Sequence, residues 1–216
     1  MTRLILVRHG QTASNVAGLL DTGLPGPGLT DLGRQQAAAL VDRLAGERIE
    51  VVVASPLART VETAGPLTQA LGLRLNQDAG LREILAGDLE GRSDRADHLA
   101  YLGAAFAWAR GETGPRIAGS PEDGADFLAR VDAAVEAATG GVDGAVVCVS
   151  HGATIRTWAT ARAANLPGDW SVEHGLPNTG VVVLEREAGG PWRAVTWQDE
   201  RVGDLSSDPT GAPVAP

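Results

Sequence analysis

Short runs of apolar residues, rich in Val, Ile and Leu, alternate along the chain with longer segments whose apolar positions recur at helical spacing. The runs predict buried strands at about 3–7, 49–54, 73–76, 145–149, 180–186 and 193–198. The longer segments predict helices at about 30–46, 55–71 and 152–164. Strands that are apolar throughout and alternate with helices indicate a largely parallel sheet covered on both faces. The chain is therefore predicted to be an α/β protein, a three-layer α/β/α sandwich with a mostly parallel open sheet.

Between about 92 and 142 the pattern changes to helices on either side of a Gly- and Pro-rich break at 111–121. This segment is predicted to be a helical cap insertion over the ligand-binding edge of the sheet. The final residues are rich in Pro, Gly, Ser and Asp, which is typical of a disordered tail. The expected organisation is one domain at 1–202, which includes the cap, and a tail at 203–216.

Two of the predicted strands end at a histidine followed by glycine. The first run ends in Arg8 and His9, and the run at 145–149 is followed by Ser-His-Gly, which contains His151. The carboxyl ends of strands in open α/β sheets are the edge at which ligands bind. We therefore expect both imidazoles to converge on one pocket, where Arg8 suits a phosphoryl group.

The composition is that of a globular protein with a proper core. Of the 216 residues 44% are hydrophobic, and the mean hydropathy is −0.03. No run of about 18 apolar residues occurs, and the first strand follows the N-terminal residue directly, so we expect no membrane contact, no secretory signal and a cytoplasmic location. The single cysteine, Cys148, lies in an apolar run and is expected to be a small core side chain.

The charge pattern narrows the ligand class. The formal net charge of −9 argues against nucleic acid as a partner, which requires a basic surface. All 18 basic residues are arginine, which excludes lysine Schiff-base chemistry and leaves planar guanidinium groups suited to phosphate oxygens. No metal-ligand spacing accompanies the histidines, so we expect neither a metal nor another cofactor.

A set of motifs in a fixed order carries a family resemblance across residues 2 to 185. They are Arg8-His9-Gly10-Gln11-Thr12 with Asn15, Leu29-Thr30 with Gly33 and Gln36-Ala37, Ser55-Pro56-Leu57-Ala58-Arg59 with Glu62-Thr63-Ala64, Leu81-Arg82-Glu83, Gly87-Asp88-Leu89-Glu90-Gly91, Ser150-His151-Gly152 and Asn178-Thr179. In these motifs the chain resembles the histidine phosphatases of the phosphoglycerate mutase-like superfamily, branch 1.

The resemblance implies the catalytic roles. It makes His9 the nucleophile of a phosphohistidine intermediate, neutral at the attacking nitrogen and hydrogen-bonded at the other, with a backbone carbonyl as the expected partner. Arg8 and Arg59 are expected to bind the phosphate oxygens. His151 is expected to complete this clamp, protonated or donating to a phosphoryl oxygen, and Gly152 leaves room for close approach.

The resemblance also selects a general acid from two carboxyl groups. Glu83 is expected to protonate the leaving oxygen, which requires a carboxyl that holds a proton near neutral pH. Glu90 is the competitor for this role. Asp88 and Glu90 are otherwise expected to orient their loop.

Further residues are expected at the substrate. Asn15 is expected to contact the same phosphate oxygens, although an asparagine here is also an ordinary helix cap. Gln11 and Thr12 are within reach of the substrate in the same motif. Thr22 and Gly23 resemble the family's substrate-facing Thr-Gly pair, although the spacing from Asn15 is one residue longer than the usual pattern.

The remaining histidines and the cap arginines have simpler interpretations. His98 is expected to be a solvated surface residue and His174 to have a structural role in a loop. Four cap arginines are candidates for a second anionic group, although a charged, solvated face is the more ordinary interpretation: Arg92, Arg95, Arg110 and Arg116.

The sequence therefore predicts a metal-independent phosphomonoester hydrolase for a small phosphorylated metabolite, with that substrate or inorganic phosphate as its partner. The first alternative is a cofactor-dependent phosphoglycerate mutase, although the segment at 84–142 does not resemble the long, basic mutase cap. The second is a non-catalytic phospholigand-binding protein on the same scaffold. The sequence leaves open whether the protein forms a homodimer.

Overall fold

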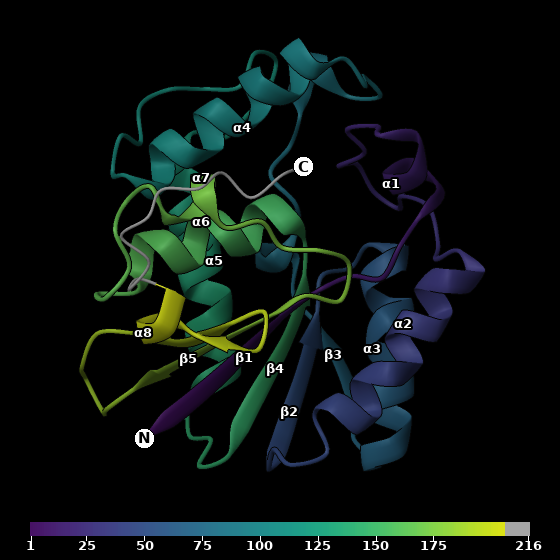
Figure 1. Ribbon diagram of the computed structural model, residues 1–216, viewed down its shortest axis with the longest axis vertical. Coiled ribbons are helices and arrows are strands. Elements are labelled where there is room, and N and C mark those ends of the chain that lie inside the picture. Colours follow the sequence, from purple (N-terminus) through teal and green to yellow (C-terminus); the bar gives the residue numbers. More distant parts are fainter. Residues whose placement is uncertain (206–216) are drawn as a thin grey trace.

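The computed structural model describes residues 1–205 and contains, within them, one seven-stranded sheet between two helical layers (Figure 1). The strand order is β3-β2-β4-β1-β5-β6-β7. The strands are β1 (Thr2–Arg8), β2 (Ile49–Ala54), β3 (Leu75–Gln77), β4 (Ala145–Ser150), β5 (Val181–Arg186), β6 (Arg193–Trp197) and β7 (Glu200–Arg201). The first four are parallel to one another, and β5, β6 and β7 each run antiparallel to the preceding neighbour. The predicted α/β class with a mostly parallel open sheet is confirmed.

The central strand β1 shows why the sheet is covered on both faces. Leu4 and Leu6 belong to the core on one face, and Ile5 and Val7 belong to the core on the other. All four are at most 3% exposed. Burial of each such side chain stabilises the fold by about 1.5–3 kcal/mol, so alternate residues of one apolar run hold both helical layers.

Each layer consists of helices whose apolar side chains meet one of these cores. One face of the sheet is covered by α2 (Asp31–Arg43) and α3 (Ala58–Leu71), which lie next to β2 and β3 in Figure 1. The opposite layer contains α5 (Gly124–Thr139) and α6 (Gly152–Arg162), with α4 (Arg95–Ala109) above them. Thr30 caps α2 as expected, and α3 begins at Ala58 rather than Ser55 because the backbone is still extended at Leu57.

The predicted cap segment, 92–142, divides into two parts. Helix α4 lies over the carboxyl ends of the strands. Helix α5 instead packs against one face of the sheet and buries Phe127, Val131 and Val135. The Gly- and Pro-rich break separates the two helices. The part that covers the ligand-binding edge is therefore α4.

Short elements had no sequence signal, because helices of one or two turns show no amphipathic period. They are α1 (Ala13–Ala17), α7 (Trp170–Glu173), α8 (Val202–Leu205) and two 3₁₀ turns, Ala79–Leu81 and Gly87–Leu89. The expected tail at 203–216 begins too early, because α8 continues to Leu205 and Val202 is buried. Residues 206–216 of that prediction lie outside the described part of the chain.

The loop after β1 is held against the start of α2 by direct backbone contact. A Cβ atom on Gly10 would lie 2.6 Å from the Gly33 carbonyl oxygen, and one on Gly33 would lie 2.2 Å from the Gln11 carbonyl oxygen. Glycine is therefore required at both positions, and the contact fixes the residues that follow β1. Within residues 1–205, no helix is long and apolar enough to cross a bilayer.

Candidate active site

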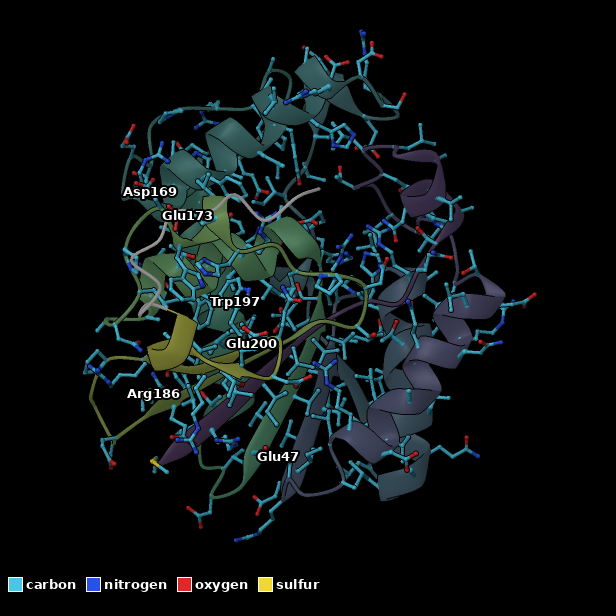
Figure 2. All side chains as sticks on the ribbon, viewed as in Figure 1. Glu47, Asp169, Glu173, Arg186, Trp197 and Glu200 are labelled. Carbon is cyan, nitrogen blue, oxygen red and sulfur yellow. The ribbon has the colours of Figure 1, made fainter. Side chains whose placement is uncertain are left out.

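A cavity of about 360 Å³ lies at the carboxyl ends of β1 and β4, beneath α4. Its wall includes residues from several predicted motifs: Arg8, His9, Asn15, Arg59, Glu83 and Gly152. Glu47, which pairs with Arg3, marks the opposite end of the sheet (Figure 2). In the described part of the chain, no three His, Cys, Asp or Glu side chains gather closely enough to hold a metal ion.

His9 is held in a single tautomer at the end of β1. Its backbone N–H donates to the Ser150 carbonyl at 3.0 Å, and its Nδ1 lies 2.8 Å from the Gly10 carbonyl oxygen. Because a carbonyl can only accept, Nδ1 carries the proton and Nε2 keeps its lone pair. Burial, followed by the charges of Arg59 and Arg8, lowers the pKa of His9 well below its usual value. The imidazole is therefore neutral at the nitrogen that nucleophilic attack requires.

Two arginines beside this imidazole each have one buried guanidinium nitrogen that makes no hydrogen bond, although an Asp21 carboxylate oxygen lies 3.7 Å from that of Arg59. Arg8 donates from Nη1 to the Leu176 carbonyl at 2.5 Å, and Arg59 donates from Nη2 to the Asp21 carbonyl at 2.9 Å. Arg8 Nε and Arg59 Nη1 are buried and have no hydrogen-bond acceptor. A Cβ atom at position 152 would lie 3.2 Å from Arg8 Nε, so Gly152 leaves room for that side chain. Unpaired buried donors of this kind indicate a site for an anion.

His151 is absent from the described cavity wall, and its expected contact with a phosphoryl oxygen stays a prediction. It is fully buried, and its Nδ1 accepts from Arg59 Nε at 3.3 Å. Its Nε2 therefore carries the proton and donates to the Ser55 hydroxyl at 2.9 Å. Burial, with the charges of Arg59 and His9, lowers the pKa of His151 well below its usual value. In this arrangement the neutral ring holds Arg59 in place.

Glu83 joins the cavity wall to the first turn of α6. Its Oε1 accepts from the Thr154 N–H and hydroxyl, both at 2.9 Å, and its Oε2 accepts from the Ala153 N–H at 3.2 Å. The side chain of the N-cap residue makes no capping hydrogen bond, so this carboxylate satisfies the helix N-terminus instead. The carboxyl group expected to act as general acid is thereby fixed in position.

Asn15 belongs to a helix cap and also lines the cavity, and its expected contact with phosphate oxygens stays a prediction. It forms a reciprocal capping box with Thr12 at the start of α1, and its Oδ1 also accepts from Asn178 Nδ2 at 3.0 Å. Asn178 Nδ2 donates in addition to the His9 carbonyl at 3.1 Å. Both Thr12 and Asn15 contribute to the cavity wall.

Gln11 and Gly23 lie outside the described cavity wall, so their expected substrate contacts stay a prediction. Gln11 Oε1 accepts from the Thr30 hydroxyl at 3.0 Å, which directs this side chain to α2. The Gly23 N–H donates to Glu90 Oε1 at 3.2 Å. Thr22 does line the cavity, and its N–H donates to the same carboxylate oxygen at 2.7 Å. Glu90 therefore orients the loop of Thr22 and Gly23, whereas the sequence predicted that it orients its own loop, and it is absent from the described cavity wall.

Helix α4 supplies residues that sequence analysis missed or misplaced. His98 was expected in solvent but lies in the cavity wall, where its Nε2 is 2.9 Å from the Gly18 carbonyl oxygen. Tyr101 also lines the cavity and donates its hydroxyl to the Ile84 carbonyl at 2.8 Å. Neither has a motif around it. Only the position of α4 over the sheet brings them to the site.

Helix α6 supplies a third arginine to the cavity, Arg156. It follows Gly152 by one helical turn, and this spacing is the one signal from which its place could have been inferred. His174 instead stacks on Trp170, with ring centroids 3.7 Å apart, in agreement with a structural role. Cys148 is fully buried, and burial raises its pKa to about 12, so it is the expected core thiol.

A neutral histidine between underpaired arginines, at the carboxyl edge of a parallel sheet, defines a site for phosphoryl transfer. Residues 4–200 match the sequence pattern of the histidine phosphatase superfamily, branch 1. The chain belongs to this superfamily, as its motifs indicated, and the expected enzyme class, a phosphatase of this superfamily, is confirmed.

Curated relatives cover most of the chain. A glucosyl-3-phosphoglycerate phosphatase from Mycolicibacterium vanbaalenii is 35% identical over 90% of this chain and 93% of its own length. The PE-PGRS family protein PE_PGRS11 from Mycobacterium tuberculosis is also 35% identical over 93% of this chain, but the match covers only 37% of that longer relative.

Solved structures agree with the fold. A mycobacterial glucosyl-3-phosphoglycerate phosphatase complexed with VO3 has a TM-score of 0.76 at 30% identity, covering 93% of this chain and 100% of that one. The phosphoserine phosphatase of Entamoeba histolytica complexed with 3-phosphoglyceric acid has a TM-score of 0.74 at 25% identity, covering 93% and 98%. The mycobacterial enzyme has also been solved with inorganic phosphate.

Proposed function

We propose that this protein hydrolyses a small phosphomonoester without a metal, through a phosphohistidine formed on His9. The observation that carries the proposal is the neutral His9 with an unprotonated Nε2, next to buried nitrogens of Arg8 and Arg59 that make no hydrogen bond. Such donors stabilise the charge that develops on the equatorial oxygens during phosphoryl transfer.

The reaction then has two displacements. In the first, His9 Nε2 attacks phosphorus, the bond to the ester oxygen breaks, and protonated Glu83 gives its proton to the leaving oxygen. In the second, water attacks the phosphoryl group, Glu83 takes the proton of the water, and the N–P bond breaks to release phosphate.

The relatives support a small organic substrate. Their names specify glucosyl-3-phosphoglycerate and phosphoserine, both of which are small phosphomonoesters. The cavity volume of about 360 Å³ is of the size that small-molecule sites have. We therefore place the substrate among small phosphorylated metabolites.

A mutase is the second candidate, because a probable phosphoglycerate mutase from Yersinia pestis is 28% identical over 95% of this chain. A mutase returns the phosphoryl group of His9 to another hydroxyl instead of to water. The lack of a long basic cap in the sequence favours the hydrolase. A non-catalytic phospholigand-binding protein is the least favoured candidate, since the full set of catalytic side chains is present.

The test is phosphate release from a panel of phosphomonoesters with a chelator present, for the wild type and His9→Ala. The panel includes 3-phosphoglycerate with and without 2,3-bisphosphoglycerate. We expect chelator-resistant release that His9→Ala abolishes. Interconversion of phosphoglycerates without net release would establish the mutase instead, and turnover that survives in His9→Ala would remove His9 as nucleophile.

A further inference from the structure

The third arginine of the cavity, Arg156, has no part in the reaction derived above. It projects from α6 into the same cavity wall as Arg8 and Glu83. Burial, followed by repulsion from Arg8, lowers its pKa to about 10, so the group is still charged at neutral pH. A cation at this depth needs an anionic or polar partner.

The protein satisfies only part of this guanidinium. Nη2 donates to the Ser171 carbonyl, and the planar group lies over the Phe106 ring with Cζ 4.6 Å from its centroid. Nε is buried and has no acceptor. The Phe106 contact restrains a guanidinium that lines the cavity and still has a buried donor without an acceptor.

The arginines of the cap segment, 92–142, show the contrast. Arg92, Arg110 and Arg116 each pair with at least one carboxylate, at 4.0, 3.2 and 2.8 Å, and none of them lines the described cavity. Asp169, a second partner of Arg110, lies near the end of α4 (Figure 2). These arginines form the charged, solvated face that the sequence left as one alternative. Arg156 has no ion pair among the described residues.

We infer that Arg156 is a specificity-determining residue that binds a carboxylate of the substrate, an inference that rests on the proposed phosphatase function. Arg8 and Arg59 are the proposed phosphate ligands, which leaves Arg156 for a second anionic group of the substrate. A guanidinium binds the planar carboxylate through paired N–H donors. The preferred substrates are therefore phosphorylated hydroxy acids rather than neutral sugar or polyol phosphates.

The test compares two substrates that differ only in this group. In 3-phosphoglycerate a carboxylate stands where glycerol 3-phosphate has a hydroxymethyl group. We expect the wild type to prefer 3-phosphoglycerate in kcat/KM, and Arg156→Gln to reduce that preference about tenfold to a hundredfold, the range for a charge-assisted hydrogen-bonded pair. Arg156→Lys keeps the charge without the planar group, and its preference for 3-phosphoglycerate should lie between those of the wild type and Arg156→Gln.

Arg162→Gln is the matched control. It removes an arginine from the same helix, but one that pairs with Asp132 at 2.6 Å and lies outside the described cavity wall. Its substrate preference should equal that of the wild type. Thermal unfolding of each variant checks that the fold is retained.

The outcomes separate the two proposals. If the wild type hydrolyses both substrates equally, or if Arg156→Gln lowers both values of kcat/KM by the same factor, the carboxylate contact is wrong and the phosphatase stands. If the wild type releases phosphate from neither compound nor from para-nitrophenyl phosphate, the proposed function itself fails.

Discussion

At the scale of single residues, the site depends on which histidine nitrogen carries a proton. The Gly10 carbonyl sets the tautomer of His9, and Arg59 sets that of His151. The two rings lie edge to face, with centroids 5.3 Å apart. Protonation of one ring would place a third positive charge beside Arg8 and Arg59, and protonation of both would place a fourth. Both rings are therefore stable only as neutral imidazoles.

This arrangement predicts acid sensitivity. The pKa of both His9 and His151 is lowered in the folded state, so the unfolded chain binds more protons below about pH 6.5. Stability is therefore present above that pH and is lost as the pH falls, by up to about 1.4 kcal/mol per pH unit for each ring. Urea unfolding between about pH 7 and pH 5 measures this slope.

The control for this prediction is His9→Gln, which removes one of the two titrating rings. Its stability should fall less steeply over the same pH interval, because acidic side chains elsewhere are unchanged. Equal slopes for the variant and the wild type would show that His9 does not contribute.

At the scale of elements, Glu83, the proposed general acid, is positioned by helices that lie outside its own motif. Besides the N-terminus of α6, Arg130 of α5 holds the backbone that carries Glu83. Its Nη1 donates to the Gly80 and Arg82 carbonyls at 2.7 and 2.9 Å. Its Nε and Nη2 pair with the buried Glu122 at 2.7 and 2.9 Å. Helix α5 thus supports the site from behind.

We predict that Arg130→Met is destabilised by about 3–5 kcal/mol, since Glu122 becomes an unpaired buried charge. The double variant Arg130→Met with Glu122→Leu removes that charge and should recover most of the stability. Its kcat should stay low, however, because no side chain then holds the 80–83 carbonyls. Denaturant unfolding and steady-state kinetics distinguish the two effects. Recovery of both stability and kcat would show that Arg130 has no positioning role.

At the scale of the whole molecule, an acidic protein encloses a cationic cavity. The net charge is −9, yet Arg8, Arg59 and Arg156 meet in one cavity whose described wall carries two carboxylates, Asp21 and Glu83. Asp21 forms an ion pair with Arg59, with its carboxylate 3.7 Å from Arg59 Nη1. Local charge therefore outweighs net charge, and an anion is attracted at short range.

This charge distribution predicts that inorganic phosphate stabilises the fold. At a phosphate concentration of about 100 Kd, the gain is about 2.7 kcal/mol, or roughly 5–10 °C in Tm for a domain of this size. Thermal unfolding with phosphate, compared with chloride at equal ionic strength, measures the shift. Arg59→Gln should lose most of it. An equal shift with chloride would indicate general screening instead of a phosphate site.

The sequence by itself determined the strands, the sheet class and the residues that follow each strand. Consecutive apolar residues bury both faces of a strand, and the ends of parallel strands share one edge, so Arg8 and His9 could be placed from the pattern, whereas Glu83 was selected by the family resemblance. Only the tertiary structure decided which side chains meet from different elements. Arg156, His98 and the neutral state of His151 depend on how α4, α6 and the sheet pack, and such contacts over long sequence separations leave no periodic signal in the chain.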